Sequence, residues 1–124
     1  MNWSATGALL LGLAVMLGAF GAHGLRNRLD VYSIGVYERA VFYHFIHALG
    51  LLIASLLLRT GALSQSAGQW VCALLLAGIL IFSGSLYILA VTGMRWLGAI
   101  TPIGGLSFIA AWLLLALALV RGRG

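Results

Sequence analysis

The stretch Glu38-Arg39-Ala40-Val41-Phe42-Tyr43-His44-Phe45-Ile46-His47 opens the second of four long apolar runs in the chain. It brings two charges and two histidines into a segment that is otherwise made of apolar and aromatic residues. Each residue of a helix turns by roughly 100°, so Arg39, Tyr43 and His47 share one face and His44 borders it. At a rise of about 1.5 Å per residue, His47 approaches the middle of a bilayer if Arg39 lies at its boundary. The stretch therefore predicts a membrane-spanning helix that carries polar groups.

The four apolar runs cover residues 4–22, 39–58, 70–91 and 98–120. The chain is 63% hydrophobic and only 7% charged, whereas a soluble domain carries about 25% charged residues. Each run has the roughly 20 residues that a helix needs to cross a bilayer core. The alternation typical of barrel strands is absent, and the third connector, residues 93–97, is short enough to force an antiparallel hairpin. We predict an all-α, polytopic integral membrane protein in which residues 1–124 form a single antiparallel bundle of four helices.

The charges and the single cysteine exclude several classes of function. The net charge is +5, and the basic residues are all arginines at the ends of the apolar runs. This placement is typical of membrane-interface anchors, so we expect the lipid bilayer as a partner and no nucleic acid. Cys72 alone cannot form an internal disulfide or a cysteine metal cluster. No basic residue precedes the first run, so we read it as a retained helix and not as a signal peptide.

If the four runs cross a membrane one after another, the connectors and the termini are assigned to its two sides. We call the side of Met1 side A; the second connector, residues 59–69, and the C-terminus also lie there. Connectors 26–37 and 93–97 lie on side B, and the first of them is expected to run partly along the membrane interface. Because arginines are nearly balanced between the two sides, the positive-inside rule does not fix the orientation.

The polar residues of the bundle concentrate in its side B half, which predicts a polar pocket open to side B and closed towards side A by packed apolar residues. Its candidate lining residues are His23, Arg39, Tyr43, His44, His47, Ser83, Ser85, Tyr87, Arg95 and Thr101.

Three interpretations of the histidines remain open. A neutral imidazole can fasten helices through a hydrogen bond to a hydroxyl or a carbonyl. The same ring can belong to a proton or solute site, because ionisable groups in membrane helices are commonly functional. A metal site built from His23, His44 and His47 is the weakest interpretation, since no H-E-x-x-H is present and Arg39 would repel a cation. We expect no metal and no cofactor.

The start of the last run offers one further candidate. Gly104-Gly105 follows Pro102 at a helix start, where backbone N–H groups can face an anion. Close packing of helices through small residues is the simpler explanation, as it is for Ala14, Gly18 and Ala22 in the first run. No G-x-S-x-G motif and no phosphate-cradling glycine loop occur.

Three stretches together resemble a known family: residues 18–25 (GAFGAHGL), residues 43–50 (YHFIHALG), and residues 82–87 (FSGSLY) continuing to 95–105 (RWLGAITPIGG). In this combination the chain resembles the YgdD/YwdK-like family of small bacterial inner-membrane proteins of unknown function, which has relatives among small eukaryotic transmembrane proteins. The resemblance implies four transmembrane helices and a plasma-membrane location, and it brings no substrate or catalytic residue. The first-helix glutamate of small multidrug transporters and the Thr-Thr-Phe-Ser pattern of small fluoride channels are both missing.

We therefore expect a multi-pass protein of the plasma membrane that is not an enzyme. The first hypothesis is a structural or accessory component whose partner is another membrane protein or a second copy of the chain. The alternative is a small transporter or channel-like protein that uses the polar pocket.

Overall fold

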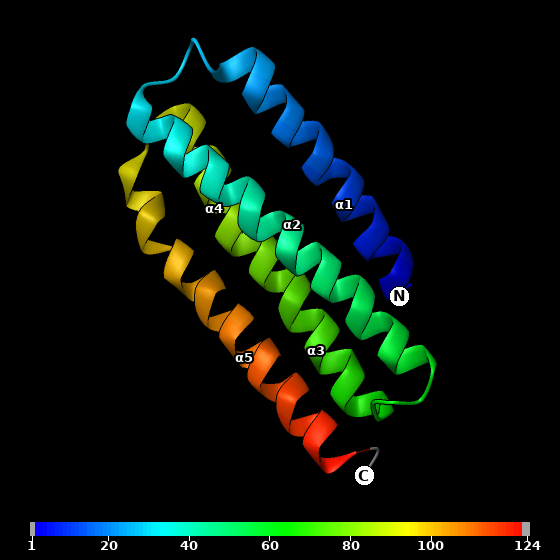
Figure 1. The fold of residues 1–124 in the computed structure, drawn as a ribbon. Helices are drawn as coiled ribbons and strands as arrows, with labels where there is room; N and C mark the ends of the chain where they lie inside the picture. Colours follow the sequence, from blue (N-terminus) through cyan, green and yellow to red (C-terminus); the bar gives the residue numbers. More distant parts are fainter. Residues whose placement is uncertain (1, 123–124) are drawn as a thin grey trace.

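The computed structural model describes residues 2–122 of the chain, and within that range it is built from helices and short connectors. Four long helical segments run antiparallel (Figure 1). Each is long and apolar enough to cross a membrane, which confirms the predicted all-α, polytopic architecture. The elements are α1 (Trp3–Phe20), η1 (Gly21–Leu25), α2 (Val31–Arg59), α3 (Gln65–Gly78), η2 (Ile79–Ser83), α4 (Gly84–Thr92), η3 (Arg95–Ala99) and α5 (Thr101–Arg121).

Two of the four segments contain a π-helical turn within a continuous helix. The first segment is α1 followed by η1, and the third is α3, η2 and α4 in succession. A π-helical turn inserts one extra residue per turn, locally widens the helix and shifts the faces that follow it. The side chains beyond each turn therefore do not follow the face expected from a regular 3.6-residue period.

Polar side chains cap the starts of three helices. Each accepts a hydrogen bond from a backbone N–H three residues later, which would otherwise be left without a partner. The capping residues are Asn2 for α1, Asp30 for α2 and Ser64 for α3. At Asp30 the hydrogen bond from the Ser33 N–H holds the pKa of the carboxyl below its ordinary value, because the bond favours the charged form.

The caps explain where the predicted boundaries were wrong. The second helix begins at Val31 and not at Arg39, so the first connector shrinks to residues 26–30 and its two tyrosines lie on α2. The third helix likewise begins at Gln65, before Trp70. Hydropathy marks where the hydrocarbon begins, but a capped helix continues into the headgroup region. Pro102 lies in the first turn of α5, as predicted. The C-terminal arginine, Arg123, lies outside the described residues.

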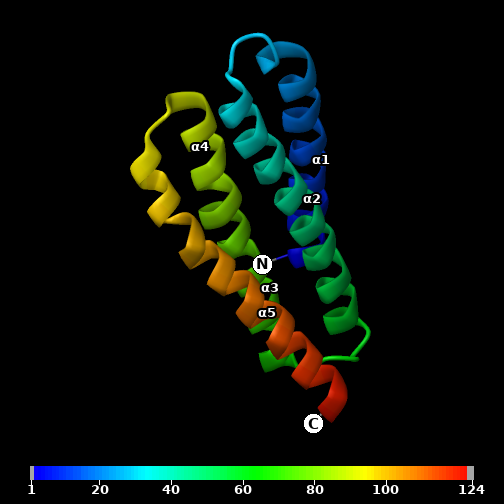
Figure 2. The same cartoon turned by 60° about the vertical axis from the view of Figure 1, so that its left-hand side comes forward.

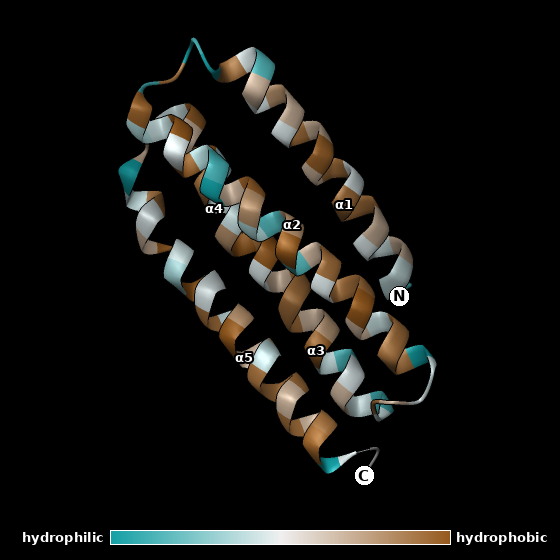
Figure 3. Ribbon diagram, viewed as in Figure 1, coloured by the Kyte–Doolittle hydropathy of each residue, from teal (hydrophilic) through white to brown (hydrophobic). Residues whose placement is uncertain are grey.

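The central position belongs to α2 and to the α3–α4 segment. α2 packs against α1 on one side and against α3 and α4 on the other, while α5 packs against α3 and η2, as Figures 1 and 2 show. The apolar windows of these two central segments are 39% and 44% buried, compared with 11% for the first segment. The first segment therefore leaves most of its surface to the lipid, and hydrophilic residues gather at segment ends and along α2 (Figure 3).

Two apolar clusters fill the interior of the bundle. One occupies the side A half and centres on Leu51, Val71 and Leu75. The other occupies the side B half and includes Tyr37, Leu86 and Leu97. The side B cluster lies in the half of the bundle for which an open polar pocket was predicted.

A glycine with a left-handed backbone ends α4. Gly93 has φ +74° and its N–H donates to the Leu89 carbonyl at 2.8 Å. A side chain at this φ is strained, so Gly93→Ala is expected to lower the free energy of unfolding by about 1 kcal/mol. An SDS titration followed by tryptophan fluorescence measures this change. Gly98→Ala is the matched control, because Gly98 has no positive φ and has open space around it; equal losses in the two variants would contradict the prediction.

Candidate functional site

His44 and Tyr87 form a buried pair between α2 and α4. The Nδ1 atom of His44 lies 2.8 Å from the Tyr87 hydroxyl, and only 2% of the His44 surface is exposed. The other ring nitrogen, Nε2, is buried and makes no hydrogen bond. The Leu10 carbonyl of α1 faces the ring without reaching hydrogen-bond geometry. His44 is thus held by one strong contact and keeps a second polar atom without a partner.

His47 is held between α2 and α5 by stacking. Its ring lies nearly parallel to Phe108 with centroids 3.5 Å apart, and Tyr43 stacks on the ring with centroids 5.8 Å apart. Nδ1 donates to the Tyr43 carbonyl at 2.8 Å, because a carbonyl can only accept. This places the proton of the neutral ring on Nδ1. The two histidines face different neighbouring helices, although they lie three residues apart.

The buried serines connect neighbouring helices. Ser83 has no exposed surface, and its hydroxyl donates to the Ala40 carbonyl of α2 at 2.8 Å. Ser85 and Thr101 join α4 to α5 through hydroxyls 2.6 Å apart. Interhelical hydrogen bonds of this kind typically contribute about 1 kcal/mol in a membrane. Their common effect is to fix the α3–α4 segment against both of its neighbours.

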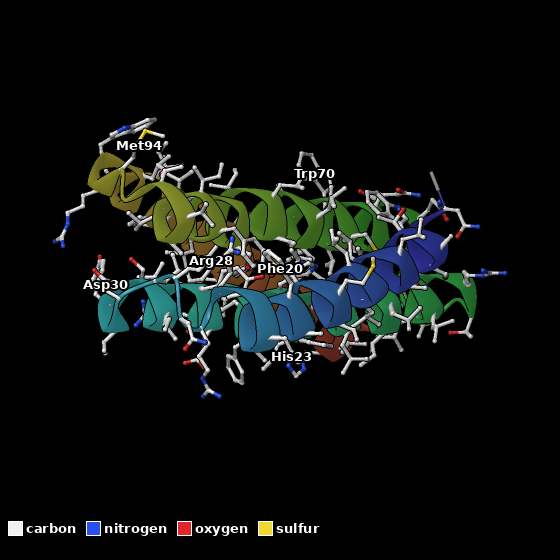
Figure 4. All side chains as sticks on the ribbon, turned by 90° about the horizontal axis from the view of Figure 1, so that it is seen from above. Phe20, His23, Arg28, Asp30, Trp70 and Met94 are labelled. Carbon is white, nitrogen blue, oxygen red and sulfur yellow. The ribbon has the colours of Figure 1, made fainter. Side chains whose placement is uncertain are left out.

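Three of the predicted pocket residues do not join this group. His23, Arg39 and Arg95 are exposed; His23 points away from the bundle in Figure 4. The Arg95 guanidinium lies 4.8 Å from the centroid of the Tyr32 ring, a cation–π contact at the side B end. Of the ten residues predicted to line a pocket, these three therefore lie apart from the buried group. That all ten line one open pocket stays a prediction.

The structure also separates the histidines considered for a metal site. Within residues 2–122 no group of three histidine, cysteine or acidic side chains is placed to hold a metal ion. Gly104, considered for an anion site, instead packs against the backbone of Phe82, since an added Cβ would lie 2.8 Å from the Phe82 Cα. The small residues at the start of α5 therefore serve close helix packing.

Sequence reasoning missed two contacts that connect helices. The Tyr37 hydroxyl of α2 donates to the Leu17 carbonyl of α1. On side A, the hydroxyls of Ser4 and Ser55 lie 2.8 Å apart, in a half predicted to be almost free of polar groups. The sequence places Ser55 in one apolar run and Ser4 at the start of another, but it does not show that the two side chains pair. Pairing depends on helix rotation, which the sequence pattern does not specify.

Removing the Tyr87 hydroxyl tests the buried pair. Tyr87→Phe leaves His44 Nδ1 without its partner, so the free energy of unfolding should fall by about 1–2 kcal/mol. Reversible unfolding in mixed micelles measures the loss. Tyr32→Phe is the control, since that tyrosine is exposed and its ring keeps the contact with Arg95. A Tyr87→Phe variant as stable as Tyr32→Phe would show that the pair contributes nothing.

Comparison with known proteins identifies relatives of the whole chain. The family model described as "Protein of unknown function (DUF423)" matches residues 17–105. A UPF0382 membrane protein of Staphylococcus haemolyticus is 49% identical over 95% of this chain and 94% of its own length. The UPF0382 membrane protein YwdK of Bacillus subtilis is 46% identical over 93% of each chain. No solved structure matches the chain.

Proposed function

Because this chain belongs to the DUF423 family of membrane proteins of unknown function, we propose that it is a non-enzymatic accessory component of a bacterial plasma membrane. Its partners lie in the bilayer: another membrane protein or a second copy of the chain. One observation carries this proposal. The buried side chains of His44, His47 and Ser83 each contact a neighbouring helix.

The arrangement of hydroxyls and imidazoles supports a non-enzymatic role. A nucleophilic serine needs a base within hydrogen-bond reach. Ser83 and Ser85 instead donate to the carbonyls of Ala40 and Phe82, and His44 contacts the Tyr87 hydroxyl. Among the residues that the structure describes, no serine–histidine pair is brought together.

Two features support the plasma membrane as the location. The four spans are helical and strongly apolar, whereas proteins of the bacterial outer membrane are typically barrels with alternating strands. The described arginines are exposed, and all of them except Arg39 lie near the ends of the spans, where they can contact lipid headgroups.

Extraction of the tagged protein in native nanodiscs tests the accessory role. We expect a complex whose measured mass exceeds that of one chain and corresponds to a fixed ratio of partner to chain. The complex should also survive transfer into a mild detergent. A strictly monomeric chain that moves protons or solutes across liposomes would overturn the proposal.

A specific observation favours a second candidate, a small proton- or solute-conducting protein. His44 Nε2 is buried without a hydrogen-bond partner, and an unsatisfied buried polar group is costly, by about 1–3 kcal/mol. Groups that persist in this state are often retained for function.

Proton flux separates the two candidates. In liposomes with an imposed pH gradient, we expect the wild-type chain and His44→Asn to give the same leak as empty liposomes. We base this expectation on the two apolar clusters that flank the buried histidines. The pH-sensitive dye pyranine reports the internal pH. A wild-type flux well above the leak and abolished in His44→Asn would instead establish the conducting role.

A further inference from the structure

A groove with a volume of about 470 Å³ runs along the outside of the bundle, where the end of the first segment meets the first half of α2. It is distinct from the buried histidines, since neither His44 nor His47 lines it. One wall is made of small residues, Gly18, Gly21 and Ala22, and the opposite wall includes the aromatic residues Phe42 and Phe45. One wall of the groove is therefore formed by small residues, and the opposite wall by bulky apolar side chains.

The contact between Gly21 and Tyr37 holds the two helices that form the groove in position. The Tyr37 ring packs so closely on Gly21 that an added Cβ would lie 2.9 Å from the ring atom Cδ1. The hydroxyl of Tyr37 also donates to the Leu17 carbonyl. These contacts fix the two helices beside the groove, where the π-helical turn η1 widens the first segment. The small residues next to the turn leave space that no side chain fills.

The dimensions of the groove fit the hydrocarbon part of a lipid. On α2 its lining residues recur every four positions, at Ile34, Glu38, Phe42 and Ile46. From Glu38 to Ile46 the helix rises by about 12 Å, close to the roughly 15 Å of hydrocarbon in one leaflet. An extended acyl chain can therefore lie along this strip from the headgroup boundary almost to the midplane.

The rim of the groove carries one charge of each sign. Arg26 and Glu38 both line it and both are exposed, at the side B end. A guanidinium pairs well with phosphate oxygens, and a carboxylate accepts hydrogen bonds from an ammonium group. The rim is therefore complementary to a headgroup that carries a phosphate and a primary ammonium, and not to one that is purely anionic.

We propose that this groove binds one phospholipid of the side B leaflet whose headgroup is zwitterionic with a primary ammonium, as in phosphatidylethanolamine. Arg26 binds the phosphate and Glu38 binds the ammonium. One acyl chain lies over Gly18 and Ala22 and against Phe42. The inference is independent of the accessory role, because a bound lipid is compatible with either proposed function.

Native mass spectrometry of the full chain, with equal mole fractions of phosphatidylethanolamine, phosphatidylcholine and phosphatidylglycerol added, tests the site. Wild type should retain one phosphatidylethanolamine in preference to the other two. Phosphatidylcholine offers no ammonium N–H to Glu38, and phosphatidylglycerol has no cation. Arg26→Gln should weaken phosphatidylethanolamine binding about tenfold, and Glu38→Gln should remove most of the preference over phosphatidylcholine, as expected for hydrogen bonds to charged groups.

Arg28→Gln is the matched control. It removes the same charge from the same connector, and Arg28 does not line the groove. All three side chains are exposed, so the variants should fold, and their melting temperatures in detergent check this. Equal retention of the three lipids by the wild type would overturn the proposal. Preference for phosphatidylglycerol, or losses as large in Arg28→Gln as in Arg26→Gln, would overturn it as well.

Discussion

Replacing Gly104 with alanine is expected to destabilise the protein by about 3 kcal/mol, the upper end of the usual range for overpacking a close-packed interior. Gly104 is buried where α5 crosses the π-helical turn η2. A Cβ at this position would lie 2.8 Å from both the Cα and the Cβ of Phe82. Backbone atoms cannot rotate away, so the two helices must move apart. The neighbouring stack of Phe108 on His47 and the hydrogen bond between Ser85 and Thr101 would then be disturbed.

The adjacent glycine provides the control. A Cβ at Gly105 would make only ordinary contact with the Phe82 ring, at 3.8 Å. Gly105→Ala removes the same backbone flexibility and has nearly the same helix propensity, so it should be neutral or slightly stabilising. SDS titrations of both variants measure the difference. If they unfold at the same SDS concentration, α5 does not approach η2 as closely as the structure indicates.

Truncating His47 to alanine is expected to lower the free energy of unfolding by about 3 kcal/mol, as for the removal of a buried aromatic ring. The ring stacks on Phe108 of α5 and also neighbours Tyr43 of α2 and Trp112 of α5. Its removal leaves a cavity between α2 and α5 and abolishes stacking contacts. Thermal unfolding in detergent, scanned at fixed lipid content, measures the loss.

His47→Phe separates packing from chemistry at this position. Phenylalanine keeps the stack on Phe108 and removes only the hydrogen bond to the Tyr43 carbonyl, which as a helix carbonyl retains its backbone partner. We expect this variant to lose no more than about 1 kcal/mol, in line with measured polar contacts between membrane helices. A His47→Phe variant as unstable as His47→Ala would show that the imidazole nitrogens, and not the ring stack, hold α5 in place.

The two histidines thus have different relations to the bundle. His47 is a packing residue whose ring connects α2 to α5, while His44 retains a buried nitrogen without a partner. Variants at the two positions therefore test different hypotheses. Loss of stability at position 47 bears on the packing of α5 against α2, and altered proton flux at position 44 bears on the conducting alternative.

The amino-acid sequence by itself determined the class of the protein, the four spans and the family. Hydrophobic runs of about 20 residues leave few solutions, because backbone polar groups in lipid must be satisfied within helices. The short connector 93–97 required an antiparallel hairpin, and Pro102 marked the first turn of the last helix. The quoted motifs were sufficient for the family resemblance because they occur together and in order between residues 18 and 105.

Only the tertiary structure decided what the polar residues contact. The helical period predicts on which face of its own helix each residue lies. The rotation of one helix relative to another, however, depends on side-chain packing. The π-helical turns η1 and η2 shift that rotation, and their positions had no sequence signal. For this reason His44 meets Tyr87 while His47 meets Phe108. For the same reason Gly21 lies on Tyr37, and the groove that this contact supports was invisible in the sequence.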